Sequence, residues 1–147
     1  MMVMIEKDTI RLLRECDAGV KMGIDSIEDV CEKVKSDNFR TLLDDCRNAH
    51  EKLDKEIQSL LESYDDDGKD PNPMTKGMSW VKTNAKLMMD CSDATIADLM
   101  TDGCNMGVKS LSRYLNEYKA ADEQSKDIAK RLISLEARLA VDIRQYL

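Results

Sequence analysis

The sequence predicts an all-α fold in one domain, residues 1–147. Apolar residues recur at steps of three and four through most of the chain, which is the spacing of helices packed along a seam. Only two prolines and six glycines occur in 147 residues, too few for a turn-rich all-β sandwich. A chain of this length can bury one sizeable core. These observations favour a bundle of four long helices.

The four predicted helices follow one another with one long interruption. The first runs from about residue 4 to 35, and the second from about 39 to 63, after the possible N-cap residues 36–38. The third begins after Ser92 and Asp93 and ends near residue 119. The fourth covers about 123–146. The second and fourth keep a strict three-four spacing of their seam residues.

The lengths of the connections predict the topology. Short breaks require an antiparallel hairpin over residues 4–63 and another over residues 93–147. The crossover between them, residues 64–92, is about thirty residues long. It can span the bundle, because a helix of about 26 residues is about 39 Å long.

The crossover carries two unusual stretches. Residues 65–70 resemble a calcium loop, but with Gly68 at the turn the first and twelfth positions are Ser63 and Met74, so the EF-hand pattern fails. We expect Gly68 to cap the second helix instead. Residues 74–89 then read as a short extra helix with three lysines and no acid.

The extra helix predicts a partner surface. One of its faces is apolar and suits docking on the bundle, while the only tryptophan, Trp80, lies with Leu87 on another face. Lys82 adds positive charge to a chain with a net charge of −7. Either one face is simply docked, or Trp80, Leu87 and Lys82 bind a second copy. We expect a homodimer or higher homo-oligomer through this region.

The two hairpins are internal repeats. Residues 19–27 match residues 103–111 at an offset of 84, with two glycines, a Met-Gly pair and a serine in register. The second helix of each hairpin aligns at an offset of 86, so residues 53–61 correspond to residues 139–147.

Repeated helical hairpins with a long crossover resemble the ferritin-like superfamily, and in particular small bacterial ferritin-like four-helix-bundle proteins of unknown function. The resemblance covers nearly the whole chain in architecture. It implies a bundle that is often oligomeric, and a di-metal site at mid-bundle in better-equipped relatives.

The residues of such a metal site are incomplete. Each Glu-x-x-His motif lacks a member, because Arg47 precedes His50 by three and Ile133 precedes Glu136 by three. His50 and Glu136 nevertheless lie on the inward seams at equivalent repeat positions, so we expect them to meet in the core. They form either a buried hydrogen-bonded pair or a reduced site for iron or another transition metal. We prefer the pair, because two ligands are too few for firm binding.

Small residues line one side of the first and third predicted helices. A glycine inside a helix costs about 1 kcal/mol relative to alanine, so four of them require a reason. Close packing of these two helices is one explanation, and a ligand groove is the other. The residues concerned are Gly19, Gly23, Ser26, Gly103, Gly107 and Ser110.

The cysteines read as core residues. Cys16, Cys31, Cys46 and Cys104 each align with an apolar residue in the other repeat, so we expect all four to be buried and unreactive. Cys91 is the expected exposed thiol. An odd number of cysteines without a CxxC pair argues against a disulfide scaffold, and neither a signal sequence nor a membrane span is evident. A cytoplasmic setting is expected.

Composition narrows the function. The acidic balance disfavours nucleic acid and membrane surfaces as partners. A single histidine gives little support to hydrolytic triads. We therefore expect a non-catalytic binding or structural protein with no catalytic residues and no cofactor. The alternative is a metal protein handling iron or peroxide at His50 and Glu136.

Overall fold

A computed structural model describes residues 2–69 and 91–147 of the chain. The described residues form four long helices and no β-strand. The helices are α1 (Met2–Cys31), α2 (Asp37–Ser63), α4 (Asp93–Glu117) and α5 (Glu123–Asp142). A short 3₁₀ helix, η2 (Ile143–Tyr146), ends the fold. The predicted all-α four-helix bundle is confirmed for these residues.

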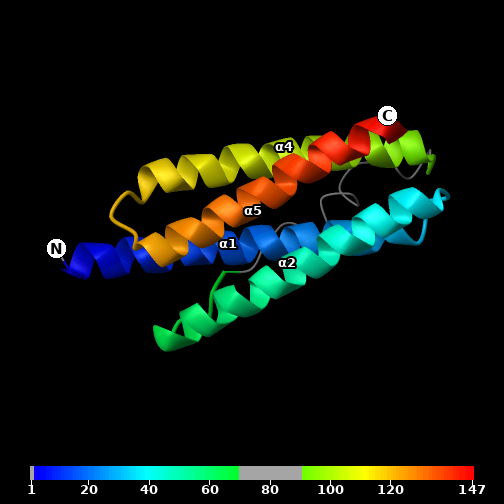
Figure 1. The fold of residues 1–147 in the computed structure, drawn as a ribbon. Helices are drawn as coiled ribbons and strands as arrows, with labels where there is room; N and C mark the ends of the chain where they lie inside the picture. Colours follow the sequence, from blue (N-terminus) through cyan, green and yellow to red (C-terminus); the bar gives the residue numbers. More distant parts are fainter. Residues whose placement is uncertain (1, 70–90) are drawn as a thin grey trace.

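The helices pair as two antiparallel hairpins, α1 with α2 and α4 with α5. Figure 1 shows α1 and α5 running in one direction and α2 and α4 in the other. Contacts at the two ends agree: Asp8 of α1 accepts from the backbone N of Ala120, while Asp93 at the start of α4 accepts from Lys35 and Ser36. The second helix therefore ends at the opposite end of the bundle from the start of α4.

Side-chain caps set three of the helix starts. Ser36, Ser92 and Asp122 each accept a hydrogen bond from the backbone N–H three residues later, which satisfies a group that the first helical turn leaves open. The predicted starts of α2, α4 and α5 consequently agree with the structure to within two residues.

The helix ends were predicted less well. The first helix was expected to reach residue 35, yet α1 stops at Cys31. The chain leaves the helix because Asp93 binds the backbone N–H groups of Lys35 and Ser36, and Arg40 donates to the carbonyl of Val34. The third helix ends at Glu117 instead of residue 119, and the last turns of the fourth tighten into η2.

Gly68 does not cap α2. That helix ends at Ser63, and Asp65 is the residue that takes the left-handed conformation, with φ of 53°. Gly68 forms a second left-handed turn, with φ of 82°, where the loop presses against α1. The approach requires glycine, because a β-carbon there would lie 2.2 Å from Asp17 Oδ2.

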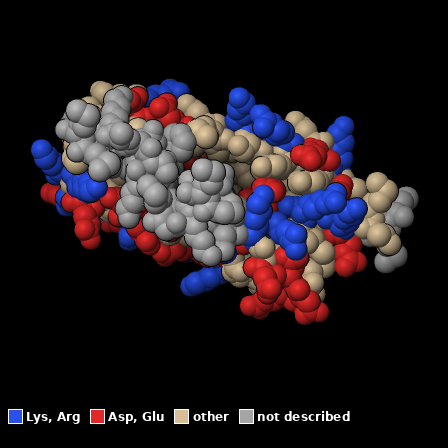
Figure 2. All heavy atoms as spheres, turned by 180° about the vertical axis from the view of Figure 1, so that it is seen from behind, with Lys and Arg blue, Asp and Glu red and all other residues tan. Residues whose placement is uncertain are grey.

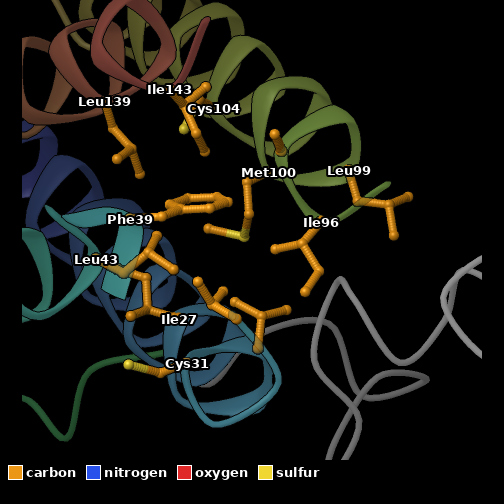
Figure 3. Close-up of a cluster of buried hydrophobic side chains, with 13 residues drawn as sticks. Ile27, Cys31, Phe39, Leu43, Ile96, Leu99, Met100, Cys104, Leu139 and Ile143 are labelled. Carbon is orange, nitrogen blue, oxygen red and sulfur yellow. The ribbon is translucent and has the colours of Figure 1, made fainter. Parts of the chain in front are cut away.

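Two apolar clusters fill the bundle, one towards each end. One is grouped around Phe39, whose ring lies among Leu43, Met100 and Leu139 in Figure 3 and stacks on Tyr146 at a centroid distance of 4.3 Å. The other contains Leu13, Val20, Ile57, Leu111 and Leu132, among others. All four long helices contribute to each cluster, so the core is continuous along the bundle except at the layer described next.

Candidate functional site

A polar layer separates the two apolar clusters. It takes one residue from each long helix: Gly23 from α1, His50 from α2, Gly107 from α4 and Glu136 from α5. Along every helix this residue falls between the members of one cluster and those of the other. His50 is fully buried and Glu136 is 9% exposed. We call these four residues the mid-bundle layer.

The sequence prediction that His50 and Glu136 meet is confirmed. His50 Nε2 lies 3.0 Å from Glu136 Oε1, and His50 Nδ1 lies 2.8 Å from the carbonyl oxygen of Cys46. A carbonyl only accepts, so Nδ1 carries a proton. Burial lowers the pKa of His50, but the hydrogen bonds to the Cys46 side chain and to Glu136, with the charge of Glu136, together raise it to about 10. The geometry and the raised pKa together favour the protonated imidazole beside Glu136.

The two glycines make room for this pair. A β-carbon at Gly23 would stand 2.8 Å from both Cδ2 and Nε2 of His50, closer than real contacts allow. At Gly107 the nearest atom would be Glu136 Cδ at 3.5 Å, an ordinary contact. The His50 ring thus lies directly against the backbone of α1, and glycine at position 23 is required for that approach.

The pair does not fit a resident metal. His50 and Glu136 supply one imidazole nitrogen and one carboxylate, and two protein ligands are too few for firm binding of a metal ion. Within residues 2–69 and 91–147, no group of three or more His, Cys, Asp or Glu side chains could hold a metal ion. Elemental analysis of the purified protein checks this reading directly.

A groove of about 590 Å³ lies between α1 and α4, beside the mid-bundle layer. All six of the predicted small residues line it: Gly19, Gly23, Ser26, Gly103, Gly107 and Ser110. Close packing of the two helices was the other expectation for these residues. The two helices contact one another, and the small residues lie along the groove between them.

The groove has apolar walls, a carboxylate in its floor and a charged end. Met22, Met100 and Leu111 belong to the walls, and Glu136 reaches the groove from α5. At one end, Lys69 Nζ lies 2.6 Å from Glu15 Oε1. From Glu15 to Ser26 the α1 wall is roughly 16 Å long at 1.5 Å per residue.

Sequence reasoning missed the contacts that bring the chain to this end of the groove. Asp17 is fully buried in α1 and accepts from Gln58 Nε2 at 2.6 Å and from the backbone N of Lys69 at 2.8 Å. Arg14 binds Asp66 through two nitrogens. We call these contacts the loop clasp. Asp17 precedes Val20 and Ile24 at the three- and four-residue spacing of the apolar seam. A carboxylate at a seam position was the sequence signal that could have indicated these contacts.

The thiols lie mostly as predicted. Cys16, Cys31 and Cys104 are buried and Cys91 is exposed, whereas Cys46 is only partly buried. Burial raises the pKa of Cys16 to about 12. Burial and the neighbouring Glu136 raise the pKa of Cys104 well above its ordinary range. Neither thiol can act as a nucleophile near neutral pH.

Trp80, Leu87 and Lys82, the predicted partner surface, lie outside the described residues, as does the expected helix over residues 74–89. On the face shown in Figure 2, acidic and basic side chains of the described residues are interspersed and form no single patch. None of the described helices combines the length and the apolar character that a membrane crossing requires.

Comparisons with protein-family models, with curated proteins and with solved structures find no match to this chain.

Proposed function

We propose that this protein is a non-catalytic helical bundle of ferritin-like connectivity that binds a small ligand in the groove between α1 and α4. The observation that carries the proposal is the groove itself. Its volume of about 590 Å³ falls in the range of ligand pockets, its walls are mainly apolar, and one buried carboxylate lies in its floor. Four glycines placed inside helices have a purpose if they keep this space open.

The chemistry around the groove supports binding over catalysis. A nucleophile needs a lowered pKa or an adjacent base, and the pKa of the groove cysteine, Cys104, is raised instead. The only histidine of the sequence is hydrogen-bonded at both ring nitrogens. Neither Cys104 nor His50 is therefore poised to attack a substrate or to transfer a proton.

Two further parts of the proposal concern the whole chain. Ferritin-like connectivity is supported by the end of α2 and the start of α4 lying at opposite ends of the bundle. Self-association through residues 74–89 remains a prediction from the sequence, and a mass in solution of about 16.7 kDa at micromolar concentration would contradict it.

An uncharged fluorescent dye tests the groove. Nile red should bind the wild type saturably with one molecule per chain. Gly107→Leu fills the groove next to Glu136 and should abolish this binding, since a β-carbon is sterically tolerated at that position. Asn105→Leu adds the same side chain to an exposed position of α4 and is the matched control. Equal dye binding by the two variants would place the dye elsewhere and contradict the proposal.

A further inference from the structure

We infer that the groove takes a slender amphiphile whose head group donates a hydrogen bond and carries no negative charge, such as a long-chain alcohol. The inference rests on the proposed function and adds the ligand class. It follows from the walls of the groove, from the acceptor in its floor and from the charges along its length.

The walls select the apolar part of the ligand. Small residues line the groove on both sides, and its α1 wall extends roughly 16 Å from Glu15 to Ser26. Met22 and Met100 add flexible, polarisable side chains that adjust to an alkyl chain. An alkyl chain can lie along the length of such a groove.

The floor selects the head group. Glu136 Oε1 accepts from His50, and Oε2 lies on the Gly107 side, 3.7 Å from where a β-carbon at that glycine would stand. A carboxylate has about four acceptor positions, of which His50 and the Cys104 side chain use two, so a hydroxyl that reaches this glycine-lined side can donate to it. Because His50 already balances the charge of Glu136, an uncharged donor leaves the pair neutral.

The charges along the groove exclude anions. Glu15 and Glu136 both line it, and Lys69 is the single cation among the described lining residues. Lys69 is already paired with Glu15, with Nζ 2.6 Å from Oε1. A carboxylate head at Glu136 would face a like charge in a partly buried space, where charges are weakly screened. Charge complementarity therefore separates an alcohol from a fatty acid of the same length.

Calorimetric titration of the full chain at pH 7 with 1-decanol and with decanoate tests the inference. We expect one molecule of 1-decanol to bind per chain. Decanoate should bind at least about tenfold more weakly, because it cannot donate a hydrogen bond to the charged carboxylate, and the loss of such a bond weakens binding by about this factor. In Glu136→Gln the preference should fall to less than about threefold, because the like charge is gone. Gly107→Leu should bind neither probe, and Asn105→Leu should match the wild type.

Equal binding of the two probes to the wild type, with loss of both in Gly107→Leu, overturns this inference and leaves the groove as a ligand site. Binding of neither probe, together with no saturable binding of Nile red, overturns the proposed function as well. That second result is expected if residues 70–90 of the same chain, or a second copy, fill the groove. The ratio in the wild type decides the matter even if Glu136→Gln fails to fold.

Discussion

At the scale of single residues, the protonation of His50 is fixed by its neighbours. The carbonyl of Cys46 and the carboxylate of Glu136 each require a proton on the ring nitrogen that faces them. A buried charge is tolerated only beside a partner of opposite charge, and His50 and Glu136 are partners of this kind. Removing either partner leaves an uncompensated charge between two apolar clusters.

Stability should fall as the pH rises from about 6.5 towards 10. The pKa of His50 is raised from 6.5 to about 10 in the folded state, so the folded protein retains a proton that the unfolded chain releases. The stabilisation is complete below pH 6.5 and is lost as the pH passes 10. Urea unfolding at pH 6, 8 and 10 measures it. His50→Gln can still donate to Glu136 but does not titrate, so an identical slope in this variant would contradict the assignment.

Gly23→Ala and Gly107→Ala should change stability in opposite directions. Both remove a glycine from a helix interior, which alone stabilises by about 1 kcal/mol. At position 23 the new β-carbon displaces the His50 ring, and we expect a net loss of about 1–3 kcal/mol. At position 107 the contact is ordinary, so the gain should remain. Chemical denaturation of both variants provides the comparison, and equal shifts would rule out the steric explanation.

At the scale of elements, the loop clasp determines where the chain goes after α2. Residues of α1 bind the loop at several points, and Asp17 accepts from the backbone of Lys69 and from Gln58. If this carboxylate is removed, the backbone N–H of Lys69 loses its acceptor, while Gln58 Nε2 keeps only Asp54 Oδ1. The clasp therefore fixes a loop that has few apolar contacts of its own and directs it towards the groove.

Asp17→Ala should cost about 1–3 kcal/mol of unfolding free energy, because a fully buried carboxylate that accepts from Gln58 and from the backbone of Lys69 is lost. Asp127→Ala removes an exposed carboxylate of α5 that pairs with Arg131, and should cost less than about 0.5 kcal/mol. Thermal or urea unfolding measures both. A similar small effect at the two positions would show that the clasp is not a structural anchor.

The sequence predicts where the helices start more accurately than where they end. Ser36, Ser92 and Asp122 act on N–H groups three residues away, so their effect is visible in the local sequence. The end of α1 depends on Asp93, which lies 58 residues from Lys35 in the chain. Local patterns cannot reveal that contact. The seam spacing therefore predicted the helices and their pairing, but it placed the end of α1 four residues too late.

At the scale of the whole molecule, the mid-bundle layer divides the core into two clusters, and the thiols report on both. Cys16 belongs to one cluster and Cys104 to the other. Their raised pKa values leave little thiolate in the folded state. Labelling of these residues consequently requires opening of the bundle.

Cys91 should react first with a thiol reagent, followed by Cys46, while Cys16, Cys31 and Cys104 react only as fast as the bundle opens. The buried three should share one labelling rate if the bundle opens as a unit, and separate rates if the two clusters open independently. Mass spectrometry after timed alkylation assigns each residue. Rapid labelling of all five without denaturant would contradict the packed core.

The internal repeat allowed one part of the candidate site, the contact between His50 and Glu136, to be predicted. The repeat placed His50 opposite Glu136, because equivalent seam positions in two hairpins face one another. The same repeat could not decide between close packing and a groove at the small residues. That outcome depends on the distance between α1 and α4, and sequence spacing carries no measure of this distance.

Each hairpin contributes a different ionisable residue to the mid-bundle layer, and this difference affects how copies of the hairpins could mispair. Two copies of the hairpin formed by α1 and α2 would bring two histidines together at the centre of such a layer. Two copies of the hairpin formed by α4 and α5 would bring two glutamates together. In either duplicate the buried group would lack a partner of opposite charge, whereas His50 and Glu136 pair with one another. Each hairpin is thereby directed to its complement and away from a duplicate of itself, which protects a chain built from similar halves against self-recognition while it folds.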